Sequence, residues 1–280
     1  MNTSEIRIDH VFAVTPTIRT WAVMAERGFT LANEMFTQPD ERYCRFIEFP
    51  QRSGAKWNTY LEFVETGEKR YNELTAPMAD RTSLTGISLG FSGGLEQFYK
   101  SKKEMFPEMG LEFSHRNYNW KDKRRLPGWN FINFTQEGLL SGIYHWFTEY
   151  ETSERSSGSR RNPVVHSNTA FDIAGLIVKG SDASVFQKLS DFTAIPLKDR
   201  NSITMDDGRY FTVSAICSEQ SIPEIAEKVP ELVAVILKVG CMNTFIEKSR
   251  PDSVVNLNGT RAAVISMGKY CWDIIGIEDQ

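Results

Sequence analysis

The residues best suited to chemistry in this sequence are a few histidines and carboxylates that lie in runs of β-branched and aromatic residues. His10 and Glu62 lie in two different runs of this kind near the start of the chain. His145 and Glu149 are four residues apart in a later run, so on a strand both would point to the same face. Imidazole and carboxylate groups can bind a divalent metal ion or transfer protons.

A serine motif offers a second kind of chemistry. Residues 90–94 read GFSGG and lie between an expected strand and an expected helix, which is the setting of a hydrolase nucleophile elbow. Ser92 would then be the nucleophile, with His145 or His166 as its base and an acid such as Asp122 orienting that base. Too few strand–helix units precede Ser92 to build a hydrolase sheet, and the chain after it is rich in strands. The glycines therefore fit a helix-entry turn better.

The other candidates have ordinary explanations. His115 stands beside Arg116 and is expected in solvent, whereas His166 is expected to pack the two halves of the chain together. Several aromatic residues could line a pocket for a planar molecule, although aromatic residues also favour strands for packing alone. These are Trp57, Tyr60, Trp129, Tyr144 and Trp146.

Composition excludes several classes of protein. The chain has 280 residues, with 32 Lys+Arg against 36 Asp+Glu and a formal net charge of −4, so it lacks the basic field of a nucleic-acid-binding protein. Its short basic runs, at 121–125 and 160–161, are expected to be solvated loops. No apolar run is long enough to span a membrane, and no secretory signal is visible. The four cysteines form no CxxC pair, which favours reduced thiols in a cytoplasmic protein.

The elements that must position these residues recur along the chain. The first copy predicts a strand at 6–14, a helix that ends at Gly28, and strands at 43–49 and 57–65. Further copies begin at residues 87, 171 and 232, and the last is the least regular.

This repetition predicts an α+β fold of four βαβββ units paired into two domains with curved mixed sheets. A polar segment rich in Ser, Arg and Gly separates the pairs. It divides the chain into a domain at 1–151, a linker at 152–165 and a domain at 166–280. Pairing two units forms a curved sheet whose hollow face, here called the cup, could hold a ligand.

The pattern resembles the vicinal oxygen chelate superfamily, which includes glyoxalases, bleomycin-resistance proteins and extradiol dioxygenases. The resemblance rests on IDHV at residues 8–11, YLE at 60–62 and HSNTA at 166–170. The last of these is similar to a glyoxalase-like subgroup with few characterised members. The family holds one divalent ion in its cup, on ligands from the first and last strands of paired units.

The resemblance implies a site in the N-terminal cup. His10 and Glu62 would be ligands of a divalent ion (Zn, Ni, Mn or Fe), with His145 or Glu149 completing the set. Glu149, if it is not a ligand, would act as general base. Ser88 stands where a further histidine ligand would be expected.

Two functions remain open from the sequence. The first is a divalent-metal-dependent, glyoxalase- or dioxygenase-like enzyme acting on a small molecule with adjacent oxygens, bound by Tyr60, Trp129 and Trp146. The alternative is a metal-free protein that sequesters an aromatic or drug-like ligand. The second half lacks the two histidines of an extradiol iron site, so that half is expected to be a structural partner. We expect no nucleic-acid or membrane partner, and a homodimer is possible.

Overall fold

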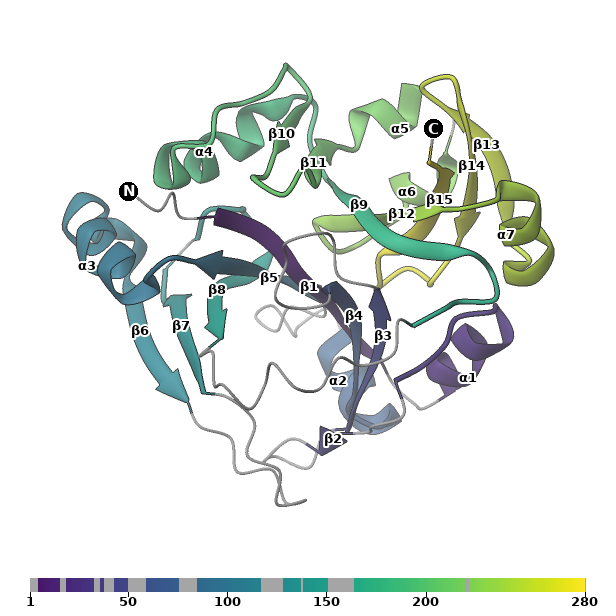
Figure 1. The fold of residues 1–280 in the computed structure, drawn as a ribbon, viewed down its shortest axis with the longest axis horizontal. Coiled ribbons are helices and arrows are strands. Elements are labelled where there is room, and N and C mark those ends of the chain that lie inside the picture. Colours follow the sequence, from purple (N-terminus) through teal and green to yellow (C-terminus); the bar gives the residue numbers. More distant parts are fainter. Residues whose placement is uncertain are drawn as a thin grey trace.

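The computed structural model describes residues 5–15, 19–32, 36–37, 43–49, 59–75, 85–116, 128–136, 138–150, 164–219 and 222–279. These residues form two mixed sheets with helices at their margins (Figure 1). Within the described residues no helix is long and apolar enough to cross a membrane.

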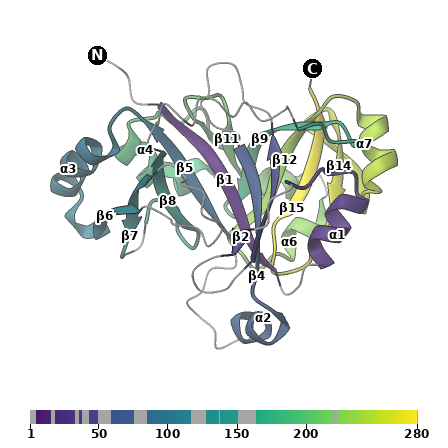
Figure 2. The same cartoon turned by 60° about the horizontal axis from the view of Figure 1, so that its bottom comes forward.

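The first sheet has eight strands in the order β2-β3-β4-β1-β5-β8-β7-β6. It joins two units. The first contains β1 (Glu5–Thr15), α1 (Arg19–Glu26), β2 (Phe36–Thr37), β3 (Tyr43–Phe49) and β4 (Thr59–Glu65), and α2 (Glu68–Thr75) follows it. The second contains β5 (Thr85–Ser92), α3 (Leu95–Met105), the 3-10 turn η1 (Pro107–Met109), β6 (Leu111–Arg116), β7 (Trp129–Phe134) and β8 (Tyr144–Tyr150). β1 and β5 lie side by side and antiparallel at the centre of this sheet (Figure 2).

The second sheet has seven strands in the order β10-β11-β9-β12-β15-β14-β13. Its first unit contains β9 (Ala170–Val178), η3 (Ala183–Phe186), α4 (Gln187–Thr193), β10 (Ser202–Thr204) and β11 (Tyr210–Val213), followed by α5 (Ala215–Glu219) and α6 (Pro223–Ala226). Its second unit contains β12 (Leu232–Val239), α7 (Met242–Ser249), β13 (Ser253–Leu257), β14 (Thr260–Ile265) and β15 (Asp273–Glu278).

The predicted fold class is confirmed, with one correction. The fourth unit, expected to be the irregular one, has its helix and four strands. The third unit is the shorter one, because after β11 the chain turns into α5 and α6 instead of a fourth strand. The predicted linker falls largely outside the described residues, so the domain boundary stays a prediction.

One hydrophobic core fills the space between the two sheets. It combines alternate residues of both, such as Val11 and Leu61 from the first and Leu176 and Val235 from the second. Trp272, in the turn before β15, is fully buried and donates an Nε1–H hydrogen bond to the Phe12 carbonyl at 3.1 Å. Three of the four cysteines are buried, and none forms a disulfide.

His166 attaches the start of the second half to the first. Its Nδ1 accepts a hydrogen bond from the Thr30 amide at 3.0 Å, and its Nε2 lies 3.1 Å from the Glu48 carbonyl. Its ring packs against Phe29 and Phe49. Burial is the main reason why the pKa of His166 falls to about 4. The expected packing role of His166 therefore matches its contacts.

The outer face of the second sheet is filled by the chain itself. Cys217, Ile222 and Ile225, from α5, α6 and the turn between them, pack on a second apolar cluster with Ala174, Ile236 and Ile275 of the strands. Beyond α6, Lys228 forms a buried ion pair with Asp273 at the start of β15 and also donates to the Gly268 carbonyl at 2.7 Å. The second sheet therefore presents an apolar, covered face where the first sheet carries polar residues.

The Lys228–Asp273 pair yields a stability prediction. Lys228→Met should lower the free energy of unfolding by about 3–5 kcal/mol, because it leaves a buried carboxylate without its counter-charge. Lys238→Met, which removes the partly exposed pair with Asp279, is the matched control and should cost about 0–1 kcal/mol. Urea unfolding monitored by circular dichroism measures both, and equal losses would contradict a charged pair at Asp273.

His166 yields a pH prediction. Its folded pKa lies below the unfolded value of about 6.5, so the unfolded chain binds more protons in acid and stability falls as the pH drops through 6.5 toward 4. Between pH 7 and pH 5 this contribution is about 2 kcal/mol. Between pH 7 and pH 5, the free energy of unfolding of His166→Gln, measured by urea unfolding, should therefore fall by about 2 kcal/mol less than that of the wild type. Parallel pH profiles for the two proteins would rule out a neutral, buried His166.

Candidate functional site

The face of the first sheet that turns away from the shared core forms the candidate site. Four residues lie in one row across four neighbouring strands, because His10 pairs with both Tyr60 and Ser88, and Ser88 pairs with Trp146. Directly paired residues share a face. Their sequence neighbours Val11, Leu61, Ile87 and Phe147 lie in the shared core, so this row lines the cup.

A bulge in β1 gathers charge at His10. The register shifts between Ile8 and His10, which places Asp9 as an extra residue opposite β5. Asp9 Oδ2 lies 2.8 Å from His10 Nδ1, and Asp9 Oδ1 accepts from Arg7 Nη2 at 3.3 Å. All three side chains are buried. Burial by itself would raise the pKa of Asp9, but the hydrogen bond from His10 and the charges of His10 and Arg7 together lower it.

Two tyrosines extend this group into a chain of hydrogen bonds. Tyr150 donates its hydroxyl proton to Asp9 Oδ2 at 2.7 Å, and the Tyr60 hydroxyl is in turn bonded to Tyr150. Burial is the main cause that raises the pKa of both tyrosines well above 10, and the Asp9 charge adds to it. Both therefore stay protonated and act as donors along the line from Tyr60 to Asp9.

His10 is held in one orientation. Its ring stacks on Tyr60 with a centroid separation of 4.5 Å and meets the edge of Trp146 at 5.4 Å. With Nδ1 held by Asp9, the other nitrogen, Nε2, faces Glu62 and lies 3.5 Å from its Oε2. A carboxylate that holds an imidazole in this way fixes the orientation of the ring and which nitrogen is free.

The counterparts of His10 and Glu62 in the second unit are hydroxyl residues. The antiparallel pairing of β1 with β5 makes Ser88 the counterpart of His10, so Trp146 corresponds to Tyr60 and Thr148 to Glu62. Ser88 Oγ and Thr148 Oγ1 are hydrogen-bonded to each other at 2.9 Å, in the same diagonal relation as His10 and Glu62.

This donor set supplies half of a metal site. His10 Nε2 and Glu62 are suitable ligands, but serine and threonine hydroxyls are not the ligands that transition metals select. In the part of the chain that the structure describes, no group of three or more His, Cys, Asp and Glu residues could hold a metal ion. Catalytic zinc sites keep three protein ligands, so these side chains do not fit a resident ion of that type.

The other predicted ligand and the predicted base lie on the opposite face of β8. His145 accepts from the Leu139 amide through Nε2 at 2.9 Å, and its Nδ1 lies 2.7 Å from the Ile143 carbonyl. Burial lowers the pKa of His145 to about 4. The structure therefore does not bring His145 to His10 and Glu62: Trp146 faces the cup, so its neighbour points away.

Glu149 also lies away from the cup, at the start of α3. Its two carboxylate oxygens accept from the amides of Gly94 and Leu95 at 2.9 and 3.0 Å. These amides lie at the N-terminus of the helix that follows the GFSGG motif, so the motif serves as a helix-entry turn. The two histidines considered as a base for Ser92, His145 and His166, are hydrogen-bonded to backbone groups elsewhere.

The three aromatic residues predicted to bind the ligand, Tyr60, Trp129 and Trp146, lie on the cup face of the first sheet. Tyr60 and Trp146 flank His10, and Trp129 pairs with Tyr150 across β7 and β8, with ring centroids 6.2 Å apart. Trp57 lies outside the described residues. Sequence reasoning missed Asp9 and Tyr150. Asp9 belongs to the IDHV segment at residues 8–11, but no local sequence pattern predicts the bulge that directs its side chain toward the cup.

Comparison with known proteins identifies solved structures that have a similar fold. No family model and no curated protein sequence matches the chain. Among solved structures, the Mn(II)-bound glyoxalase from Novosphingobium aromaticivorans superposes with a TM-score of 0.57 at 9% identity, covering 99% of this chain and 83% of its own. The 2,3-dioxygenase LapB from Pseudomonas sp. KL28 gives 0.52 at 10% identity, over 99% and 93% of the two chains. A hypothetical protein from Staphylococcus aureus gives 0.52 at 12% identity, over 98% and 100%.

These three structures superpose on nearly the whole of this chain. At such low identity the likeness concerns the fold alone. The chain therefore has the same fold as these glyoxalase and dioxygenase structures, which is the fold that the resemblance at residues 8–11 and 60–62 led us to expect.

Proposed function

We propose that the N-terminal cup binds a small molecule directly on protein side chains, without a resident metal ion. The observation that carries this proposal is the Ser88–Thr148 hydrogen bond. These two residues are the counterparts of His10 and Glu62 in the second unit, so they occupy the positions from which two further metal ligands would have to come. In this pair one hydroxyl donates and the other accepts, so the two positions hold a neutral hydrogen-bonded pair where two further metal ligands would be needed.

The cup residues define the chemistry of the ligand. Tyr60 and Trp146 offer flat aromatic surfaces on either side of His10. The Glu62 carboxylate, whose Oε2 lies 3.5 Å from His10 Nε2, offers acceptor oxygens beside the ring, which suit a ligand that donates hydrogen bonds, such as a phenol or an enediol. A planar small molecule with adjacent hydroxyl groups meets both requirements.

A second candidate, the metal-dependent enzyme, is favoured by one observation. Asp9 contacts His10 Nδ1 in the way that carboxylates orient metal-bound histidines from behind, and Glu62 lies at the other ring nitrogen. A weakly held ion on these two side chains would take its remaining ligands from the substrate and water. Metal content separates the two candidates.

Elemental analysis of the untagged protein tests the proposal. Wild-type protein should carry well under one equivalent of Zn, Ni, Mn or Fe, even after incubation with each ion and gel filtration, because only two ligands converge. Ser88→His combined with Thr148→Glu should raise retention toward one equivalent, since it restores four ligands. Ser88→Ala with Thr148→Ala is the matched control and should leave the metal content unchanged.

One result would reverse the assignment. If wild-type protein retains close to one equivalent of a single metal, and His10→Ala and Glu62→Ala each remove it, the cup is a metal centre and the second candidate holds. This comparison uses wild-type protein and two cup variants, so it decides the question even if the four-ligand variant does not fold. Circular dichroism of each variant checks the fold.

A further inference from the structure

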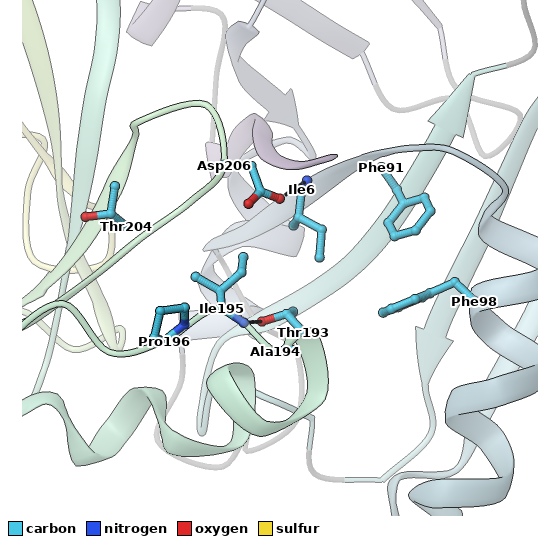
Figure 3. A pocket seen from close by; sticks show the side chains of 9 residues that line it. All are labelled: Ile6, Phe91, Phe98, Thr193, Ala194, Ile195, Pro196, Thr204 and Asp206. Atoms are coloured by element: carbon cyan, nitrogen blue, oxygen red, sulfur yellow. Dashed lines mark hydrogen bonds between the residues drawn. The ribbon is translucent and has the colours of Figure 1, made fainter. Parts of the chain in front are cut away.

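An arginine lies on the cup face of the first sheet, in the row next to that of His10. Arg7 pairs with Gly90 of β5, and the adjacent pair of the same two strands joins Ile6 to Phe91. Ile6 and Phe91 belong to the shared core, and both line a cavity at the junction of the two halves (Figure 3). Because side chains alternate along a strand, Arg7 and position 90 face the cup.

Gly90, the first glycine of the GFSGG motif, leaves the space that the Arg7 side chain occupies. A Cβ atom at position 90 would lie 2.9 Å from Arg7 Cζ and 3.0 Å from its Cγ and Nε. Such separations are too short for a real Cβ atom, so any larger residue at position 90 would force the guanidinium to move. The Arg7 side chain therefore lies across the glycine, with only 9% of its surface exposed.

Most of the hydrogen-bonding capacity of this guanidinium is unused within the described residues. Its one hydrogen bond there runs from Nη2 to Asp9 Oδ1 at 3.3 Å, whereas Nε and Nη1 have no partner in that part of the chain. The other Asp9 oxygen, Oδ2, is already bonded to His10 and Tyr150. Burying charged donors without acceptors costs free energy, which a ligand with acceptor oxygens would recover.

The charges along the cup give a bound ligand a direction. His10 Nδ1 faces Asp9 and so the Arg7 end of the cup, while His10 Nε2 faces Glu62 at the other end. A carboxylate on the ligand is attracted by the guanidinium and repelled by Glu62, whereas hydroxyl groups can donate to Glu62. The planar guanidinium also presents pairs of N–H groups that match the two oxygens of a carboxylate.

We propose that Arg7 is the residue with which the cup recognises an acidic group. The ligand is then an aromatic acid whose carboxylate and hydroxyl groups lie on opposite sides of its ring. The carboxylate accepts hydrogen bonds from the guanidinium donors that Asp9 leaves free, and the hydroxyl groups donate to Glu62. This inference rests on the proposed function, because it assigns the second end of the ligand that the cup binds.

Calorimetric titration of the full chain with three related probes tests the inference. 3,4-Dihydroxybenzoate should bind about tenfold more tightly than catechol, a modest gain because Asp9 offsets part of the Arg7 charge. 2,3-Dihydroxybenzoate, whose carboxylate adjoins its hydroxyl groups, should bind no more tightly than catechol. If catechol binds and 3,4-dihydroxybenzoate binds no better, the inference fails while the proposed function stands. If none of the three binds, the proposed class of ligand fails with it.

Variants then locate the group that binds the acid. Arg7→Met should abolish the preference for 3,4-dihydroxybenzoate and leave the affinity for catechol within about twofold. Gly90→Ala should also weaken binding of the acid, since the added methyl group displaces the guanidinium. Arg261→Met removes an exposed arginine of β14 and is the matched control, with no change expected. A folded Arg7→Met protein, checked by circular dichroism, that still prefers the acid overturns the inference. The comparison of probes on wild-type protein decides the question if a variant does not fold.

Discussion

The antiparallel pairing of β1 with β5, in which His10 lies opposite Ser88, is the constraint on which the rest of the first half depends. It joins two units edge to edge into one sheet. Because side chains alternate along a strand, this register sends Val11, Leu61 and Phe147 into the shared core and leaves His10, Tyr60 and Trp146 in the cup. A slip of one residue would exchange the two faces and bury the polar row among apolar side chains. Packing of the core on one face of the sheet therefore fixes the positions of the cup residues on the other face.

Much of the fold could be predicted from local patterns. Alternating or continuous apolar runs marked the strands, and the strands predicted at 6–14 and 43–49 coincide with β1 and β3. The boundary between strand and helix in the third unit could not be predicted, because the alternation of apolar and polar residues in β11 continues through Ser214 and Ala215 into α5. Residues 210–216 read equally well as one strand, and only packing against the second sheet separates them into a strand and a helix.

The candidate site could be predicted in part. The quoted segments brought His10 and Glu62 together correctly, since both belong to adjacent parallel strands of one unit. The face of β8 was beyond local reasoning. His145 and Glu149 do share a face, but which face it is depends on the pairing of Ser88 with Trp146, a partner on another strand. The bulge at Asp9 is a property of the pairing of two strands and has no signature in either one.

The hydrogen bond from Trp272 to Phe12 joins residues that are 260 positions apart. During synthesis the first strand therefore emerges long before the side chain that completes its surroundings. Its direct neighbours, β4 and β5, also come from distant parts of the chain. Such non-local contacts must close large loops before they contribute free energy, which slows folding. Until the second half has been synthesised, the apolar face of the first sheet lacks the residues that cover it, and such exposed apolar surface promotes aggregation.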